Sequence, residues 1–333
     1  MKYVIVGAGI AGVTAAKTIR NIDKTGEIIL IGKEQYFPYN RYVLTEYLCG
    51  LIEDPQLFYT SPDFFNELAI TFRKGQYVKS IDCSKKTLKL FHNEVIPYDR
   101  LMLATGGCSS VGSVLRPYTK FIQRYCSLED ILLIKKQLPD IHRCIVSGEG
   151  LSTLDLMCGL RNLNKEIIYV TRTEKAGFPL IESTFGDQIH EFLVNKGIRI
   201  ICEDRIVFIE KKDSRYQAVT FKGHELTGDM IFASDHYQPN IKCIKDTPIE
   251  RKTGILVDLH LKTSLHDIYA AGDCVEIYHP GVKDYWINFG WPNALKQGEI
   301  AGKNMAGQIE EYKISDVIVF NLMGKSLTAR WWE

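Results

Sequence analysis

Two short glycine-rich runs have the composition and spacing that a phosphate-binding loop needs. The first is a complete Gly-x-Gly-x-x-Gly over residues 7–12, and the second starts at Gly148. In such a loop the first glycine permits a tight turn, the second lets the backbone approach a pyrophosphate, and the third lets the following helix pack on the strand. The helix N-terminus then offers free N–H groups and the positive end of its dipole to the phosphates. The two runs therefore predict two nucleotide-binding domains.

The first loop lies in the surroundings that this motif requires. A buried strand is expected over residues 2–6, a helix from the loop to about Asn21, and a second strand over residues 27–31. Glu34 then falls where an acidic residue binds a ribose hydroxyl. Strand, loop, helix, strand and acid in this order predict a bound dinucleotide, and a Rossmann fold that holds no ligand is the alternative. The residues expected to contact the dinucleotide are Gly7, Gly9, Ile10, Ala11, Gly12, Lys33 and Glu34.

The second loop departs from the motif at two points. Gly148 and Gly150 are kept, but Thr153 replaces the third glycine. The acid expected after the second strand of this unit is absent, and Arg172 stands in its place. An arginine there can receive a 2′-phosphate, which would favour NADP(H), and a solvated surface charge is the alternative. We expect Gly148, Gly150 and Arg172 to contact a nicotinamide nucleotide.

Alternating strands and helices must position the two loops. In the second copy we expect a strand over residues 144–147, a helix to about Asn162 and a strand over residues 166–171. Further strand-rich or apolar segments cover residues 72–90, 100–104, 198–209, 217–226 and 229–233. This order implies parallel sheets with right-handed crossovers, so the expected fold class is α/β with two Rossmann-like domains. Residues 109–120 are expected to form a linker.

Bulk composition excludes several classes of function. The chain has 333 residues, more than one hydrophobic core usually holds, and its net charge of +1 gives no electrostatic footprint for nucleic acid or an anionic membrane. The N-terminus runs directly into the first strand without a signal sequence, so we expect a cytoplasmic protein. Nine scattered cysteines include no CxxC pair, so we expect neither a metal cluster nor a paired disulfide relay.

Two later segments resemble the remaining fingerprints of the FAD-dependent pyridine nucleotide–disulfide oxidoreductases. They are Leu103–Gly107, which reads LATGG, and the run from Thr263 to Asp273, which ends in IYAAGD. The resemblance implies that the first loop binds FAD. It also implies that Asp273 hydrogen-bonds the flavin ribitol and that Gly272 lets the backbone come close. The further contacts implied for FAD are Ala104, Thr105 and Gly106.

A third segment, residues 37–48, is similar to the NADH:rubredoxin reductase and nitrite reductase branch of that family. Its Pro-Tyr-Asn-Arg run implies that Asn40 and Arg41 lie beside the flavin ring, where Arg41 would favour the reduced, anionic flavin. A surface arginine is the alternative. The Trp-Pro-Asn-Ala run from Trp291 opens a helix expected to reach about Met305, and in the family its N-terminus faces the flavin pyrimidine. Trp291 and Asn293 are therefore counted as flavin contacts, with a hydrophobic staple as the alternative.

The resemblance also implies a domain order, in which the NAD domain is inserted in the FAD domain. The expected parts are 1–112 for the first part of the FAD domain, 113–238 for the NAD(P) domain, 239–310 for the second part of the FAD domain, and 311–333 for the remnant of a C-terminal domain. Relatives continue into that domain, so the surface near its stub could bind a partner. Arg330, Trp331 and Trp332 are of residue types enriched at interfaces.

The implied activity is electron exchange between NAD(H) or NADP(H) and a redox protein, through FAD. The partner would be rubredoxin, a ferredoxin or an iron–sulfur subunit of a larger complex. One alternative is an NAD(P)H oxidase or peroxidase in which Cys49 is redox-active, although Cys49 is better explained as a packed small residue. Another alternative is a flavin-binding subunit without catalysis, whose altered second loop binds nothing.

Overall fold

The computed structural model describes residues 1–176, 183–288, 290–314, 317–322 and 325–330. The chain divides into two compact units, each built from separate stretches of sequence. The first unit comprises Met1–Asn40, Phe58–Gly107 and Gln238–Ser315. The second comprises Arg41–Leu57, Cys108–Tyr237 and Asp316–Glu333.

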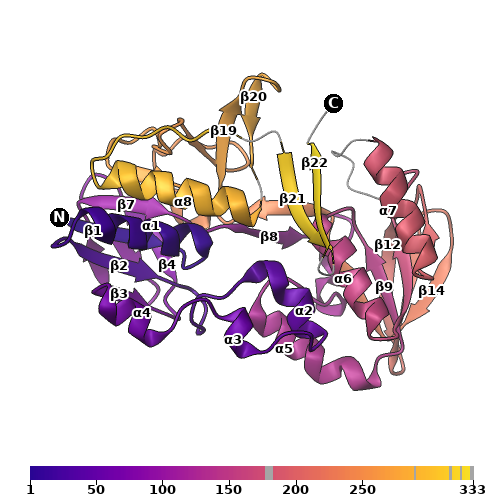
Figure 1. The fold of residues 1–333 in the computed structure, drawn as a ribbon. Helices are drawn as coiled ribbons and strands as arrows, with labels where there is room; N and C mark the ends of the chain where they lie inside the picture. The colour runs from indigo at the N-terminus through magenta and orange to yellow at the C-terminus, as the bar shows by residue number, and fades with distance from the viewer. Residues whose placement is uncertain (177–182, 289, 315–316, 323–324, 331–333) are drawn as a thin grey trace. The chain divides into compact units, whose positions relative to one another are not determined.

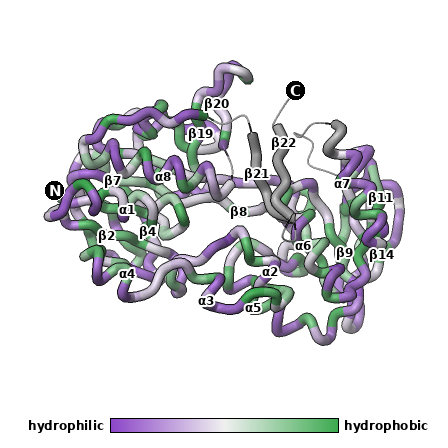
Figure 2. The backbone as a smooth tube through the Cα atoms, viewed as in Figure 1, coloured by the Kyte–Doolittle hydropathy of each residue, from purple (hydrophilic) through white to green (hydrophobic). Residues whose placement is uncertain are grey.

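A five-stranded parallel sheet forms the centre of the first unit, in the order β18-β7-β1-β2-β3. Its strands are β1 (Lys2–Val6), β2 (Glu27–Ile31), β3 (Ile70–Arg73), β7 (Arg100–Leu103) and β18 (Ile268–Ala270). Strands of a parallel sheet are covered on both faces, which explains why these segments are nearly continuous apolar runs. Figure 2 shows green, hydrophobic stretches of the tube near the labels β2 and β7.

Two helices from opposite ends of the sequence pack side by side on this sheet. They are α1 (Ile10–Ile22) and α8 (Trp291–Met305), shown in Figure 1. A Cβ atom on Gly298 would lie 2.3 Å from the Ala11 carbonyl oxygen, and one on Gly302 would lie 2.9 Å from the Ala15 oxygen. Glycine at these two positions therefore permits the close approach of the helices.

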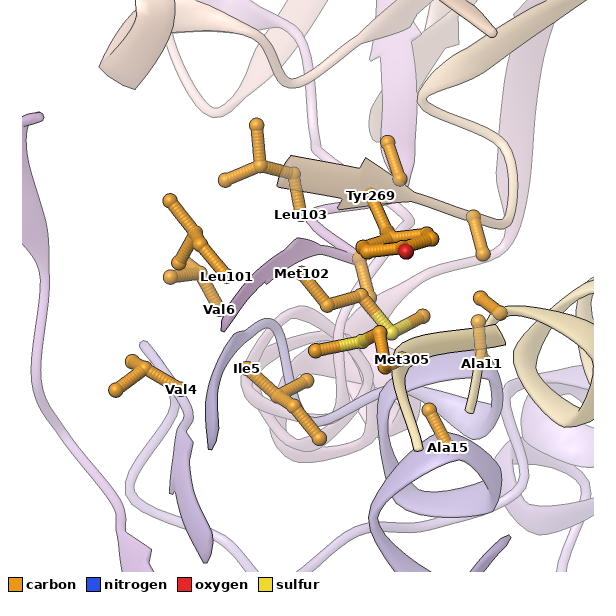
Figure 3. Close-up of a cluster of buried hydrophobic side chains, with 14 of the residues drawn as sticks. Val4, Ile5, Val6, Ala11, Ala15, Leu101, Met102, Leu103, Tyr269 and Met305 are labelled. Atoms are coloured by element: carbon orange, nitrogen blue, oxygen red, sulfur yellow. The ribbon is translucent and has the colours of Figure 1, made fainter. Parts of the chain in front are cut away.

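The side chains beneath the two helices form one apolar core. Figure 3 shows Ile5 of β1, Met102 of β7 and Tyr269 of β18 gathered around Met305 of α8 and Ala15 of α1. Ile5, Met102 and Ala15 have no exposed surface. The sheet and the two helices are thereby packed against each other, which positions the loops that join them.

A buried arginine ties α1 to the loop that leads into β3. Arg20 is 9% exposed and donates hydrogen bonds to four backbone carbonyl oxygens. These belong to Leu68 (2.7 Å), Asp23 (2.9 Å), Gly26 (2.8 Å) and Ala69 (3.0 Å). Buried carbonyl groups need hydrogen-bond donors. The Arg20 side chain supplies these donors in a bend where local backbone hydrogen bonds do not.

Smaller elements complete the first unit. An antiparallel sheet consists of β4 (Val78–Asp82), β5 (Thr87–Leu90) and β6 (Val95–Pro97), and a second sheet of β17 (Ile255–Val257), β19 (Val275–His279) and β20 (Asp284–Trp286). The short helices are α4 (Pro62–Glu67) and the 3₁₀ turn η4 (Lys242–Ile244).

The second unit contains a four-stranded parallel sheet in the order β11-β10-β9-β15. The strands are β9 (Arg143–Ser147), β10 (Glu166–Val170), β11 (Arg199–Ile201) and β15 (Met230–Ala233). An antiparallel sheet adds β12 (Ile206–Lys212), β13 (Arg215–Thr220) and β14 (Glu225–Gly228). The helices are α5 (Leu128–Gln137), α6 (Leu151–Asn162) and α7 (Ser183–Asn195), with the 3₁₀ turn η3 (Leu138–Asp140).

Two further segments belong to the second unit. One holds the 3₁₀ turn η1 (Arg41–Val43), α2 (Leu44–Leu48) and α3 (Asp54–Leu57), and α2 packs on α5 and α6. The other holds the antiparallel strands β21 (Val317–Leu322) and β22 (Lys325–Arg330). In the ranges that the structure describes, no helix is long and apolar enough to cross a membrane.

The predicted fold class is confirmed, because both loops lie in α/β units with parallel sheets. The expected linker over residues 109–120 is wrong in part. It contains the end of β8 (Gly107–Ser110), which pairs with β16 (His236–Pro239), and most of the 3₁₀ turn η2 (Arg116–Phe121). The domain boundaries drawn from the sequence stay a prediction.

Candidate dinucleotide-binding loops

The first glycine loop connects β1 to α1 and is packed at two of its three glycines. Gly7 has φ +113°, and a Cβ atom there would lie 2.0 Å from the carbonyl oxygen of Ala104. A Cβ atom on Gly12 would lie 1.9 Å from the Gly7 oxygen. At Gly9, by contrast, an added Cβ meets no atom of the described chain within 4 Å. The loop is thus closely packed at Gly7 and Gly12 and has open space at its middle glycine, Gly9.

This open face fits a pyrophosphate. Gly9 is the N-cap of α1, so no cap side chain competes for the N–H groups of the first helical turn. Those N–H groups and the helix dipole favour an anion. An acidic side chain in the first turn would oppose such a ligand, and α1 has none there. The chemistry of this donor set matches the phosphate-binding role predicted from the sequence.

Lys33 and Glu34 follow β2, as the sequence predicts. The Glu34 carboxylate accepts a hydrogen bond from the Tyr39 hydroxyl at 2.7 Å, which holds it after the strand. The backbone carbonyl oxygen of Glu34 accepts the Gly75 N–H at 2.8 Å. Lys33 lies over the ring of Tyr77, with 5.8 Å from its Nζ to the ring centroid. Both residues are therefore fixed by contacts within the first unit.

The segment Ala104–Gly106 leaves β7 at the same edge of the sheet. The Ala104 N–H donates to Val6 O at 2.7 Å, which continues the pairing with β1. Gly106 has φ +62° and turns the chain. Asn240 then holds this turn, since its N–H donates to Gly106 O at 2.9 Å and its side-chain amide donates to Thr105 O at 3.2 Å. This role of Asn240 was not predicted from the sequence.

Gly272 and Asp273 follow β18 on the same sheet. Gly272 has φ +83°, and its N–H donates to the side-chain oxygen of Gln297 at 2.7 Å. Gln297 is fully buried on α8 and was not predicted as a site residue. The Asp273 carboxylate accepts the Gly290 N–H at 3.4 Å, just before α8 begins. The third fingerprint is therefore linked directly to the start of α8.

The start of α8 brings the last two predicted flavin contacts into the first unit. Gly290 is the N-cap, with φ +105°. Trp291 packs edge-to-face on Tyr59, with 5.5 Å between ring centroids. The Asn293 side-chain oxygen accepts the Tyr312 hydroxyl at 3.3 Å. Asn293 and Gln297 are one helical turn apart, so they lie on the same face of α8.

The second loop keeps the turn of the first. Gly148 has φ +121°, and a Cβ atom there would lie 2.0 Å from the Ser234 carbonyl oxygen, as Gly7 faces Ala104. Thr153 is buried, and its N–H donates to Gly150 O at 2.9 Å. A Cβ atom on Gly150 would make only ordinary contacts, the nearest at 3.8 Å. The loop therefore has the backbone form of a dinucleotide turn although its third glycine is missing.

An ion pair joins the second loop to the end of β10. The carboxylate of Glu149 accepts hydrogen bonds from the Arg172 N–H (2.9 Å), Nε (3.2 Å) and Nη2 (2.6 Å). The side chain of Glu149 is 7% exposed and that of Arg172 is 44% exposed. Burial raises the pKa of Glu149, but the hydrogen bonds from Arg172 outweigh it and the pKa lies below its usual value. Arg172 therefore follows β10 and is paired with Glu149, a partner that the sequence did not predict.

The segment that starts at Arg41 is described with the second unit. Arg41 Nη1 donates to the Cys126 carbonyl oxygen at 2.5 Å. The Thr45 hydroxyl bonds both Tyr125 and Asp155. Cys49 donates through its thiol to Gly159 O at 3.4 Å, and burial raises its pKa to about 12. Asn40, the neighbour of Arg41, ends the first stretch of the first unit.

Most of the residues expected at a partner interface are not among those that the structure describes. Trp331 and Trp332 are not among the described residues, and only the backbone of Arg330, at the end of β22, is described.

Within the described ranges, no three His, Cys, Asp or Glu side chains are grouped as metal ligands.

A parallel sheet with a glycine turn after its first strand, present twice in one chain, defines a protein with two dinucleotide-binding folds. Residues 1–298 match the family described as pyridine nucleotide-disulphide oxidoreductase. The chain belongs to this family of oxidoreductases, whose members are flavoproteins that bind FAD and NAD(P)H. The family assignment made from the sequence is confirmed.

Named relatives cover nearly the whole chain. It is 30% identical to the NADH-rubredoxin oxidoreductase of Clostridium acetobutylicum over 93% of this chain and 76% of that protein. It is 29% identical to the 3-phenylpropionate/cinnamic acid dioxygenase ferredoxin–NAD(+) reductase component of Photorhabdus laumondii, over 92% of this chain and 77% of that one. The fold matches the solved covalent putidaredoxin reductase–putidaredoxin complex with a TM-score of 0.90, at 23% identity, over 98% of this chain and 80% of that chain.

Proposed function

We propose that the first unit binds FAD, that the second binds a nicotinamide nucleotide, and that the protein exchanges electrons between the nucleotide and a redox protein. The observation that carries this proposal is the repeated glycine turn. Gly7 and Gly148 each have a positive φ and each face a strand-end carbonyl at a distance that excludes any side chain. Such a turn at the carboxyl edge of a parallel sheet is where dinucleotides bind.

Different residues of the first unit would bind different parts of FAD. The loop N–H groups would bind the pyrophosphate above Gly9, and the Glu34 carboxylate would accept a ribose hydroxyl. Asp273, set beside Gly290, would accept a ribitol hydroxyl. The first helical turn of α8 would place positive dipole charge near any negative charge on the ligand. The other contacts proposed in the first unit are Gly7, Ile10, Ala11, Gly12, Lys33, Asn40, Ala104, Thr105, Gly106, Gly272, Trp291 and Asn293. Arg41, which belongs to the second unit, stays the residue proposed to tune the flavin.

Bound FAD would supply hydride and single-electron chemistry, and the chain would supply binding, orientation and electrostatics. In the second unit, Gly148 and Gly150 would admit the nucleotide pyrophosphate, and Arg172 lies at the strand end where the adenosine ribose is bound in such folds. A redox protein as partner is supported by the relatives, two of which are named for ferredoxin and rubredoxin.

The test is anaerobic reduction of the purified holoprotein by NADH and, separately, by NADPH, observed through the flavin absorbance. We expect one of the nucleotides to bleach the flavin, and added rubredoxin or ferredoxin to reoxidise it. A protein that carries FAD but is bleached by neither nucleotide would overturn the reductase proposal and favour a non-catalytic flavin subunit. Reoxidation by O₂ or peroxide alone would favour an oxidase or peroxidase.

The oxidase or peroxidase alternative needs a reactive thiol at Cys49. Burial and the nearby carboxylates of Asp155 and Glu46 raise the pKa of Cys49 to about 12. A thiol with so high a pKa is a poor nucleophile at neutral pH, because the thiolate is the reactive form. The surroundings of Cys49 therefore support its reading as a packed small residue.

A further inference from the structure

Glu149 occupies the middle position of the second glycine turn, and its carboxylate accepts hydrogen bonds from the residues around it. Its Oε1 atom accepts the backbone N–H and the Nε–H of Arg172, and its Oε2 atom accepts Nη2–H. The Thr171 hydroxyl is a fourth donor, at 3.5 Å from Oε1. The equivalent position in the first turn is Ala8, which cannot make such bonds. The carboxylate therefore lies between the loop and the end of β10.

That location matters because dinucleotide folds place an acid at the end of the second strand to bind the adenosine ribose. In this chain Thr171 and Arg172 follow the strand instead. The loop supplies a carboxylate to the same strand end, and the charge of Arg172 is compensated by it. Arg172 Nη2 is also 3.4 Å from the Asp235 carbonyl oxygen, so this edge of the guanidinium is occupied.

We propose that Glu149 is the residue that makes the second site select NAD(H) over NADP(H). This inference rests on the proposed function of the second unit as a nicotinamide nucleotide site. A ribose 2′-hydroxyl can donate to the Oε2 atom of Glu149, to which the described residues supply one donor, Arg172 Nη2. A 2′-phosphate would carry close to two negative charges onto a site whose single arginine is already neutralised by a buried carboxylate.

The ionisation state supports this role. The hydrogen bonds from Arg172 hold the pKa of Glu149 below its usual value despite burial, so the group is a carboxylate at neutral pH. Arg172 alone would attract a 2′-phosphate, and Glu149 alone would repel it. Removal of Glu149 and removal of Arg172 should therefore shift the nucleotide preference in opposite directions. A purely structural role of the pair would not produce these opposite shifts.

The test compares ligand binding in the FAD-loaded protein, with 5′-AMP and adenosine 2′,5′-bisphosphate as probes in titration calorimetry. The ratio of kcat/KM for NADH and NADPH is measured on the same samples. Wild type should favour 5′-AMP and NADH. Glu149→Gln should shift both ratios towards the 2′-phosphorylated ligand by about tenfold or more, which corresponds to about 1.4 kcal/mol. Arg172→Gln should shift both ratios the other way.

A matched control exists on the same two strands. Arg143 at the start of β9 pairs with Glu166 at the start of β10, at 2.6 Å, and both side chains are exposed. Glu166→Gln removes an exposed Arg–Glu ion pair at the other end of the same two strands, so it should leave both ratios unchanged. This variant separates a local effect at the second turn from a general loss of charge.

The outcomes separate the inference from the proposed function. A wild type that prefers the bisphosphate, or a folded Glu149→Gln protein with an unchanged ratio, would overturn the role of Glu149 while the nucleotide site stands. If Glu149→Gln does not fold, the Arg172→Gln variant decides, since its side chain is 44% exposed. Failure of wild type to bind either probe or to be reduced by either nucleotide would refute the nucleotide site itself.

Discussion

Replacement of Gly9 by glutamate should abolish FAD binding and leave the first unit folded. Gly9 has φ −77° and ψ −176°, which any residue adopts, and an added Cβ meets no described atom within 4 Å. The free energy of unfolding should therefore change by less than about 1 kcal/mol, as for glycine replaced at a compatible site. The same space is the one through which the pyrophosphate would approach.

The expected loss of affinity follows from the bonds that would be lost. If two N–H donors of the loop can no longer reach the phosphates, the cost at about 1.5 kcal/mol for each hydrogen bond to a charged group is about 3 kcal/mol. That is about a hundredfold in the dissociation constant before the repulsion by the new carboxylate is counted. Fluorescence titration of the apoprotein with FAD measures the affinity, and urea unfolding measures the stability.

Two further variants make the result specific. Gly12→Ala should have the opposite profile, because its Cβ would be 1.9 Å from the Gly7 oxygen where ordinary contact begins at 3.4 Å. Forcing α1 away from β1 should cost at least about 1–3 kcal/mol of stability. Lys17→Glu places a carboxylate on the exposed face of α1 and changes the charge there from +1 to −1, a larger change than in Gly9→Glu, yet it should keep FAD. A Gly9→Glu protein that binds FAD as tightly as wild type would refute the assignment of the first loop.

Three other perturbations test separate features. The Lys86 ammonium lowers the pKa of Asp267 to about 2, so this carboxylate stabilises the fold above about pH 4 and loses its contribution as the pH falls to about 2. Asp267→Asn should lower the unfolding free energy at pH 7 by about 1–2 kcal/mol and have no effect near pH 2, and equal losses at both would contradict this. Cys49→Ser should leave nucleotide-driven flavin reduction unchanged, and loss of turnover would restore the thiol mechanism. Arg20→Met leaves buried carbonyls without donors and should cost about 3 kcal/mol in urea unfolding, so an unchanged midpoint would show that water replaces the side chain.

Local patterns carried most of the fold. The predicted strands at residues 2–6 and 27–31 agree with β1 and β2, because buried parallel strands are continuous apolar runs that end at a glycine turn or a change to polar residues. The helix expected to end at about Met305 ends at Met305. The expected linker was wrong in part because β8 is defined by pairing with β16, more than a hundred residues away, and nothing in its own composition reveals that partner.

The parts of the site that were missed depend on contacts between distant residues. Gln297 reaches Gly272 across the packing of α8 on the sheet, and a buried glutamine has no local signature. The Glu149–Arg172 pair could have been found, because β9 and β10 pair in parallel with Ser147 opposite Val170. Residues two positions beyond each strand end then come together. The sequence showed a missing acid, and the register of β9 and β10 places Glu149 beside Arg172.

The close packing of α8 on α1 also has a consequence for biosynthesis. The sheet that carries the first glycine turn is complete only when β18 and α8 have been made, long after β1, β2, β3 and β7. At about 5–20 residues per second, the gap between β7 and β18 lasts on the order of 10–30 s on the ribosome. During that time all four strands of the other parallel sheet are synthesised, so the nascent chain can form the nucleotide fold of the second unit first. Capture of the cofactor by the first glycine turn would therefore be a late event in the maturation of this protein.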